Sequence, residues 1–239
     1  MTKPDRYFYS TAAALCLLVM FLGFMPYYLS GHGQHGRVIS PAIAQVVFVH
    51  GMAVTAWYLL SLVQALLISM KNRKLHMTLG WSAVGLLPLV AVSGVMVAVR
   101  STRGSPDFVF FGMRYPDFLL VMLMEIAVFT LFVVAGILTR KQPAIHRSMM
   151  LLASLSLLLG ATARMPWLNG LFGGDTRLGF FGPVFSLGVL LLLVRYRLTE
   201  TFDRWFARGL AFMIIVFVGA ERLSQTEAWR HLAGNLLKS

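Results

Sequence analysis

Long apolar segments, separated by short polar and basic connections, run through the whole chain. Seven of them can be distinguished, at about residues 8–29, 41–70, 77–99, 117–139, 146–166, 178–194 and 207–229. A helix needs about 20 apolar residues to cross the roughly 30 Å hydrocarbon core of a bilayer. The pattern therefore predicts an all-α, polytopic transmembrane bundle of seven helices, a single domain over residues 1–239. In the seventh segment only residues 209–220 are uninterrupted, so an interfacial hairpin is the alternative there.

The composition indicates an integral membrane protein. Of the 239 residues, 58% are hydrophobic and 13% are charged, and the mean hydropathy is +0.74. The net charge of +12 does not indicate a nucleic-acid partner, because the basic residues lie singly or in short clusters between apolar segments. We expect the lipid bilayer as a partner and no nucleic acid. The first apolar segment leads into PYYLSGHG without a small-x-small cleavage site, so we expect a retained helix, not a signal peptide.

Lysine and arginine are denser in every second connection. With the N-terminus inside, 12 of the 21 Lys and Arg residues fall on the inner side, mostly in the shorter connections. Cytoplasmic connections carry such an excess. The distribution predicts an N-in, C-out topology in a bacterial cytoplasmic (inner) membrane. Aromatic rings that prefer the interface then lie on the outer side, namely Tyr27, Tyr28, Tyr115 and Trp167.

The second segment carries its polar groups along one face. His50, Trp57, Ser61 and Gln64 are spaced by 7, 4 and 3 residues, which places them within an arc of roughly 60° on a helix. Polar groups at membrane depth turn toward the bundle interior or a wet cavity. We expect this face to point inward, where Trp57 and Gln64 also suit packing and interhelical hydrogen bonding.

Charged residues of three other segments lie in the outer half of the membrane. Measured from the inner helix ends at 1.5 Å per residue, Glu125 lies at roughly 22 Å, Arg164 at roughly 27 Å and Glu221 at roughly 20 Å. On the same measure His50 lies at roughly 31 Å. Because intramembrane charges are costly and usually paired, we expect the two acids to pair with Arg164 and Arg222, with His50 nearby, in one cluster open to the periplasm. The alternative is that both arginines and Glu221 extend to lipid headgroups.

Two histidines follow basic turns. The turns KNRKLH and TRKQPAIH each end in a histidine at the start of the returning helix, His76 and His146, and the two hairpins form a weak internal repeat. Haem iron takes axial imidazoles from facing helices at matching depth. A b-type haem between these histidines is one interpretation, and contact with lipid headgroups at the cytoplasmic interface is the other. His32 and His35 lie together in an outer loop without a third ligand, so we expect no metal site there.

Several functions are excluded by what the segments lack. No lysine lies inside any of the seven segments, which excludes a retinal Schiff base, and no phosphate-binding glycine loop, HExxH or GxSxG motif occurs.

The pattern favours a binding or transport component over an enzyme. We expect its pocket to take a small polar or amphipathic ligand, contacted by His50, Trp57, Glu125, Arg164 and Glu221. One alternative is a membrane redox protein that uses haem or a quinone through His76 and His146. Another is an accessory subunit whose polar residues only hold helices together.

A series of motifs covers roughly residues 45–166: HGMAVTAWYLLSLVQALLI, then RKLHMTLGW, then an acid in the fourth segment, then IHRSMMLLA followed by ATARMP. This order resembles a broad group of uncharacterised bacterial multi-spanning membrane proteins. The resemblance implies no particular activity, and Met77 stands where that group has a basic residue. The matching positions are His50, Trp57, Gln64, His76, Glu125, His146 and Arg164. A more distant likeness, to cytochrome b561-type bundles, rests only on histidines at helix ends.

Overall fold

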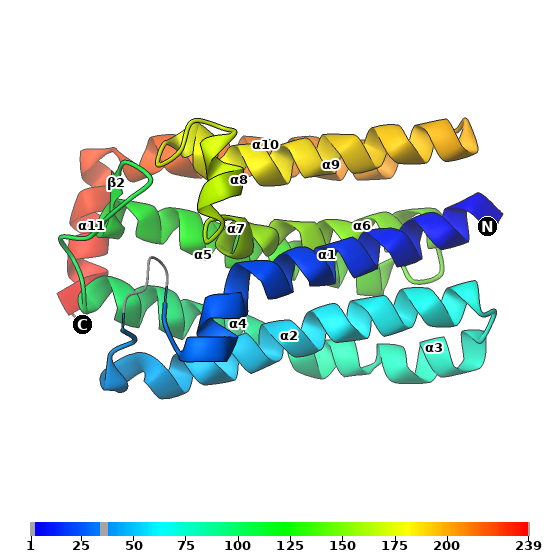
Figure 1. The fold of residues 1–239 in the computed structure, drawn as a ribbon, viewed down its shortest axis with the longest axis horizontal. Helices are drawn as coiled ribbons and strands as arrows, with labels where there is room; N and C mark the ends of the chain where they lie inside the picture. Colours follow the sequence, from blue (N-terminus) through cyan, green and yellow to red (C-terminus); the bar gives the residue numbers. More distant parts are fainter. Residues whose placement is uncertain (1–2, 34–37, 239) are drawn as a thin grey trace.

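A computed structural model describes residues 3–33 and 38–238 of the chain (Figure 1). It is almost entirely helical, as the apolar pattern predicts. Its elements are α1 (Lys3–Ser30), α2 (Pro41–Ser69), α3 (Arg73–Gly80), α4 (Ser82–Arg103), β1 (Val109–Phe110), β2 (Met113–Arg114), α5 (Tyr115–Leu138), α6 (Pro143–Ser156), α7 (Leu158–Thr162), α8 (Pro166–Gly170), α9 (Arg177–Thr199), α10 (Arg204–Ser224) and α11 (Glu227–Lys238).

Six helices among the described residues are long and apolar enough to cross a membrane, which indicates a multi-pass membrane protein. They comprise Tyr7–Ser30, Pro41–Ser69, Arg73–Arg103, Tyr115–Leu138, Pro143–Thr162 and Arg177–Thr199. The third of these joins α3 to α4, and the fifth joins α6 to α7. Helix α10 runs back along the bundle beside α9 (Figure 1). It is not among the six helices that are long and apolar enough to cross a membrane. A seventh crossing stays a prediction.

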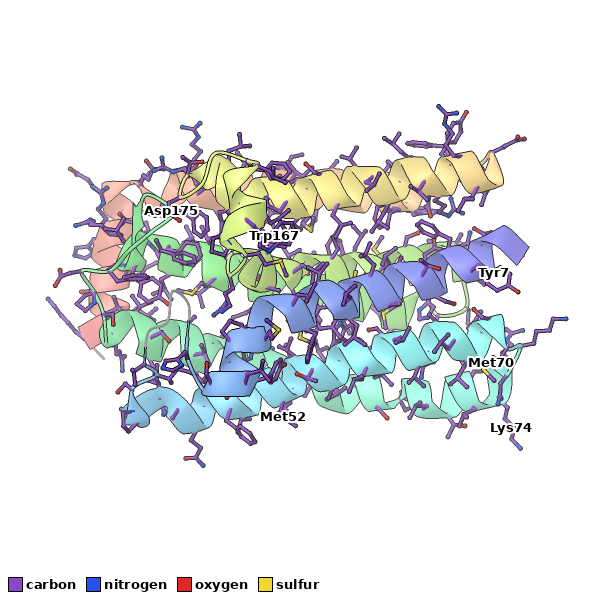
Figure 2. All side chains as sticks on the ribbon, viewed as in Figure 1. Tyr7, Met52, Met70, Lys74, Trp167 and Asp175 are labelled. Carbon is purple, nitrogen blue, oxygen red and sulfur yellow. The ribbon has the colours of Figure 1, made fainter. Side chains whose placement is uncertain are left out.

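The long helices lie side by side along one axis, and the two termini lie at opposite ends of the bundle (Figure 1). The end with the N-terminus also holds the connections α2–α3, α5–α6 and α9–α10. Met70 and Lys74 mark this end in Figure 2, and Asp175 marks the other. Helix α11 lies across that other end. The connections that are rich in lysine and arginine are therefore gathered at the N-terminal end.

Prolines and a capping carboxylate set where several helices begin. Pro41 and Pro143 occupy the first position of α2 and α6, where the missing N–H would be unpaired in any case. Asp203 caps α10 by accepting hydrogen bonds from the backbone N–H groups of Trp205 and Phe206, at 3.2 and 3.0 Å. The starts of these helices are thus determined locally.

The helix predicted over residues 146–166 is interrupted at Leu157, between α6 and α7. Just before the break, the Ser156 hydroxyl donates a hydrogen bond to the Ala153 carbonyl oxygen at 2.9 Å. Side-chain hydroxyls that bond to the preceding turn compete with the helical ladder and bend helices. After the break, α7, which contains Gly160, packs on α1 and α9.

The helix predicted over residues 207–229 is shorter than expected, since α10 ends at Ser224. The chain then turns into α11, whose N-terminus is capped by Thr226, which accepts a hydrogen bond from the Trp229 backbone N–H at 3.3 Å. The Trp229 indole N–H donates to the Pro116 carbonyl oxygen at 3.0 Å. Helix α11 therefore packs on the start of α5 and does not extend α10.

The connection between α4 and α5 contains a short antiparallel hairpin that the sequence did not predict. Val109–Phe110 pairs with Met113–Arg114 across a turn in which Phe111 and Gly112 have φ of 47° and 72°. The Phe111 ring is buried, with its centre 5.3 Å from that of Phe180 on α9. The hairpin thus folds back onto the end of the bundle, and its Phe110 lines the cavity described below.

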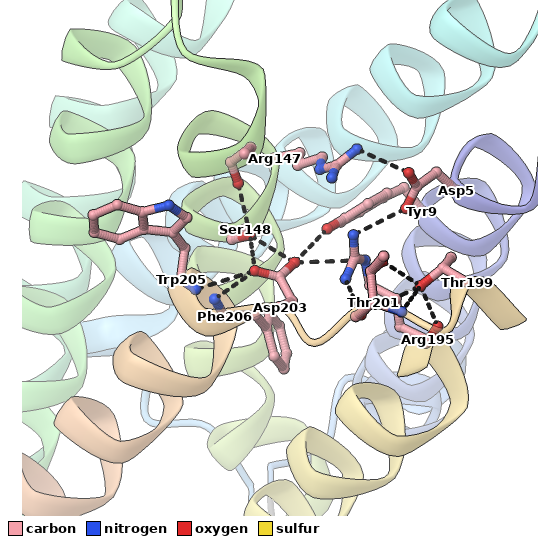
Figure 3. A network of polar contacts seen from close by, with 11 residues as sticks. Asp5, Tyr9, Arg147, Ser148, Arg195, Thr199, Thr201, Asp203, Trp205 and Phe206 are labelled. Carbon is pink, nitrogen blue, oxygen red and sulfur yellow. Dashed lines mark hydrogen bonds and ion pairs between the residues drawn. The ribbon is translucent and has the colours of Figure 1, made fainter. Parts of the chain in front are cut away.

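A buried polar network joins four helices at the N-terminal end (Figure 3). The Arg195 guanidinium on α9 contacts Asp5 at 3.1 Å and Asp203 at 3.5 Å. Tyr9 on α1 and Ser148 on α6 each donate a hydrogen bond to Asp203 at 3.0 Å. Arg195 is only 5% exposed. From the sequence, Arg195 was counted among the basic residues of the connections that orient the helices. In the structure its guanidinium is buried between two carboxylates.

Candidate ligand-binding cavity

A cavity of about 200 Å³ lies inside the bundle, toward the end opposite the N-terminus. A cavity of about 150 Å³ is sufficient for benzene, so this one has room for a small organic molecule. Its wall is mainly apolar and aromatic and includes Met20, Phe24, Val54, Phe110, Phe118, Met122, Ile126 and Phe180. An imidazole, a carboxylate and a guanidinium also line it, those of His50, Glu125 and Arg164.

His50 reaches the cavity from α2 and is held there by α4. Its Nδ1 lies 3.0 Å from the Ser93 hydroxyl oxygen. A Cβ atom on Gly94 would lie only 3.1 Å from His50 Cε1, so the absence of a side chain lets the imidazole lie against the α4 backbone. Helix α4 therefore supplies both a hydrogen-bond partner and the space for the ring.

Glu125 on α5 and Arg164, just after α7, meet at the backbone of Gly160. The Gly160 N–H faces the Glu125 carboxylate, and the Arg164 guanidinium donates a hydrogen bond to the Gly160 carbonyl oxygen. The guanidinium carbon also lies over the Phe24 ring, 4.5 Å from its centre. The two charges interact electrostatically, but no direct ion pair joins these two described side chains. Each thus retains capacity to bind another group.

Glu221 is not among the residues that line the cavity. It is buried near the end of α10 and forms ion pairs with Arg177 and with Arg222, the latter at 3.5 Å, and it accepts a hydrogen bond from Gln225. Helix α10 packs against α5, α6 and α9, and none of its residues lines the cavity. The expected contact of Glu221 with Arg222 is present, but its expected place beside His50 is not.

Trp57 lies in the core and outside the cavity lining. It is 1% exposed, and its indole N–H donates a hydrogen bond to the Ser154 hydroxyl oxygen at 3.2 Å. Its ring packs edge-on against Phe129, with 4.9 Å between the centres. Ser154 also donates to Ser61 at 3.3 Å. On the inward face of α2, His50 therefore lines the cavity, whereas Trp57 and Ser61 form hydrogen bonds to α6.

The two turn histidines lie close together at the opposite end of the bundle. The ring centres of His76 and His146 are 6.3 Å apart, and the ring planes are 88° apart. The Nδ1 atom of His76 lies 3.3 Å from the Gln64 carbonyl oxygen, and that of His146 lies 2.8 Å from the Gly136 carbonyl oxygen. The structure thus brings together two residues that the sequence separates by 70 positions.

The sequence also drew attention to two histidines, His32 and His35, in the connection between α1 and α2. His32 forms a backbone bridge with Val38, and His35 lies outside the described residues. Within residues 3–33 and 38–238, no three His, Cys, Asp or Glu side chains are arranged to hold a metal ion.

Several cavity residues had another expected role. Tyr27, Tyr28 and Tyr115 were expected at the membrane interface, and they line the cavity. The Tyr28 hydroxyl is within 2.6 Å of the Thr55 hydroxyl on α2. Ser93, the partner of His50, had no distinguishing signal in the sequence beyond its place next to Gly94.

The lining combines complementary hydrogen-bonding groups. Arg164 only donates, an ionised Glu125 only accepts, and His50 does either. An ionised Glu125 would also balance the charge of Arg164. Small-molecule sites are commonly apolar cavities with a few convergent polar groups. No protein-family model, curated protein or solved structure matches the chain.

Proposed function

We propose that this protein is a binding or transport component of a bacterial inner membrane that takes a small amphipathic molecule into the cavity. The observation that carries the proposal is the convergence of His50, Glu125 and Arg164, from three parts of the chain, on one mainly aromatic cavity. The apolar body of the ligand would lie against the aromatic rings. Its head would carry hydrogen-bond donors and acceptors and no net charge, because Arg164 and Glu125 balance each other.

We propose an N-in, C-out orientation, in which the cavity faces the periplasm. The basic connections α2–α3, α5–α6 and α9–α10 lie at the N-terminal end (Figure 1), and cytoplasmic connections are usually the basic ones. The cavity lies toward the other end, next to Tyr27, Tyr28 and Tyr115. In this orientation a ligand would enter from the periplasm or from the outer leaflet.

Three probes with the same chain length and different head groups test the proposal: octanamide, octanoate and octylamine. Their binding to the purified protein in detergent is measured by calorimetry. We expect octanamide to bind best, and we expect Arg164→Met to weaken it about 10- to 100-fold, the usual effect of losing a charged hydrogen-bond partner. Glu125→Gln should strengthen the binding of octanoate relative to that of octylamine, because the charge that remains in the cavity, on Arg164, is positive.

The matched control is Glu221→Gln, which changes a buried glutamate outside the cavity lining. It should leave the binding of all three probes unchanged. If Glu125→Gln and Arg164→Met lower the thermal stability but leave probe binding unchanged, the proposal is wrong and these groups belong to an accessory subunit in which they only join helices.

A further inference from the structure

Two basic turns, α2–α3 and α5–α6, lie side by side at the N-terminal end of the bundle. The Arg140 guanidinium of the second turn lies over the ring of Trp81, which joins α3 to α4, with 5.6 Å between its central carbon and the ring centre. His76 and His146, just after the two turns, have ring centres 6.3 Å apart. The two turns therefore form one surface. This basic-turn surface comprises Lys71, Arg73, Lys74, Trp81, Arg140 and Lys141, all of them exposed.

No carboxylate of the chain neutralises the five cations of the basic-turn surface. Neither residues 41–106 nor residues 126–174, which include both hairpins, contain an aspartate or a glutamate. At the same end, Asp5 and Asp203 are buried and form ion pairs with Arg195. Throughout the part of the chain that the structure describes, no ion pair involves any of the five cations. The counter-charge of this surface is therefore supplied from outside the chain.

Trp81 and Arg140 place the surface at the level of phospholipid headgroups. Trp81 lies at the start of α4 and is 61% exposed, and tryptophans at the ends of membrane helices prefer the interface with water. Arg140 stacks on this ring with the face of its guanidinium, and it donates one hydrogen bond, to the Ile137 carbonyl oxygen at 3.3 Å. Its remaining N–H groups lie in the plane of the guanidinium, where they suit a phosphate.

An apolar surface adjoins the cations. Helices α4 and α5, which begin and end beside Trp81 and Arg140, pack against each other and expose Val84, Val134 and Leu138. We propose that the basic-turn surface binds an anionic phospholipid, whose phosphate contacts Arg140 and whose acyl chains lie along α4 and α5. A free phosphate would use only the cations, whereas a phospholipid uses the cations, the exposed indole and the apolar side chains together.

The test counts the phospholipid that the purified full-length chain retains in a neutral detergent, by native mass spectrometry. The probes are dioleoylphosphatidylglycerol and dioleoylphosphatidylcholine, which share their acyl chains and a phosphate but differ in net charge. We expect the wild type to retain phosphatidylglycerol in preference to phosphatidylcholine. Arg140→Gln should weaken the binding of phosphatidylglycerol about fivefold, the usual effect of one basic residue next to anionic lipid.

Arg197→Gln is the matched control, because it removes an exposed arginine at the same end of the bundle but outside the basic-turn surface. It should leave the retention of phosphatidylglycerol unchanged. Equal losses in the two variants would show that the lipid responds only to the charge of the whole end, and equal retention of the two lipids by the wild type would show no preference for an anion. Either result overturns the proposal.

A competition experiment distinguishes the lipid from a free anion. Inorganic phosphate should displace no more phosphatidylglycerol than sodium chloride does at the same ionic strength. Complete displacement by phosphate alone would show that the ligand is a free anion and would overturn the lipid site. Octanamide binding to Arg140→Gln should equal that of the wild type, because Arg140 does not line the cavity. Failure of the lipid site is therefore distinguishable from failure of the cavity.

Discussion

Single glycines determine how closely the helices around the cavity approach one another. A Cβ atom on Gly23 of α1 would lie 2.3 Å from the Ala161 carbonyl oxygen of α7. Only a residue without a side chain permits this contact between two backbones. The contact also holds α7 in the position from which Gly160 meets Glu125 and Arg164.

We therefore expect Gly23→Ala to push α1 away from α7. The change should destabilise the protein by about 1–3 kcal/mol, as overpacking does, and it should weaken octanamide binding as well. Gly85→Ala is the matched control, because a Cβ at Gly85 on α4 meets no atom within 4 Å. It should leave the stability unchanged or raise it by up to about 1 kcal/mol. Thermal unfolding in detergent compares the two, and equal melting temperatures would contradict this account of α1 and α7.

The sequence allowed part of the candidate site to be predicted at the residue scale. Depth along a helix follows from counting residues, so His50, Glu125 and Arg164 could be placed at a similar level, and they share one cavity. The direction in which a side chain points around the bundle depends on the packing order of the helices, which one sequence does not specify. For this reason Glu221, which does contact Arg222 as expected, was placed in the same cluster as His50 although it lies outside the cavity lining, and Ser93 was missed.

At the scale of elements, α11 closes the end of the bundle near the cavity. Its Trp229 side chain packs with Ala98 and Leu119 of α4 and α5, and Arg230 reaches Asp117 at 3.4 Å. Residues 207–229 were predicted as one apolar segment, but α10 ends at Ser224 and α11 begins at Glu227. The polar residues Ser224 to Glu227 mark the turn, but only the contact with α5 shows that the second part lies across the bundle.

We expect Trp229→Ala to detach α11 from the bundle end. Trp229 is 9% exposed, and the substitution removes both its packing and its hydrogen bond to Pro116. We therefore expect the free energy of unfolding to fall by about 3 kcal/mol. Hydrogen exchange should show faster amide exchange across α11 than in wild type, with little change in α2. Leu232→Ala, at a position that is 59% exposed, serves as the control. Slow exchange in α11 of the Trp229 variant would show that another contact anchors this helix.

At the scale of the whole molecule, different kinds of contact join the helices at the two ends of the bundle. Near the cavity, the rings of Phe110, Phe118 and Phe180 pack against one another. At the N-terminal end, the polar network joins Asp5 to Arg195, 190 positions apart, and Tyr9 to Asp203, 194 positions apart (Figure 3). No local pattern distinguishes Arg195 from the neighbouring Arg197, because both follow the apolar run of α9. Their difference arises from the packing of α1 and α6 against one side of that helix.

The strongest test of this network is the replacement of Arg195 by Met, which retains an unbranched apolar side chain. The change leaves the carboxylates of Asp5 and Asp203 buried without that guanidinium, and removing one partner of a buried ion pair costs about 3–5 kcal/mol. Arg197→Met, at an exposed position two residues later, should change the stability by no more than about 0.5 kcal/mol. Adding Asp203→Asn to Arg195→Met should recover part of the loss, since asparagine still caps α10 and removes one unpaired charge. Thermal unfolding in detergent compares the melting temperatures of the three variants. If the double variant melts at a lower temperature than Arg195→Met, the carboxylate of Asp203 stabilises the bundle through its other partners. Arg195 is then not the centre of the network.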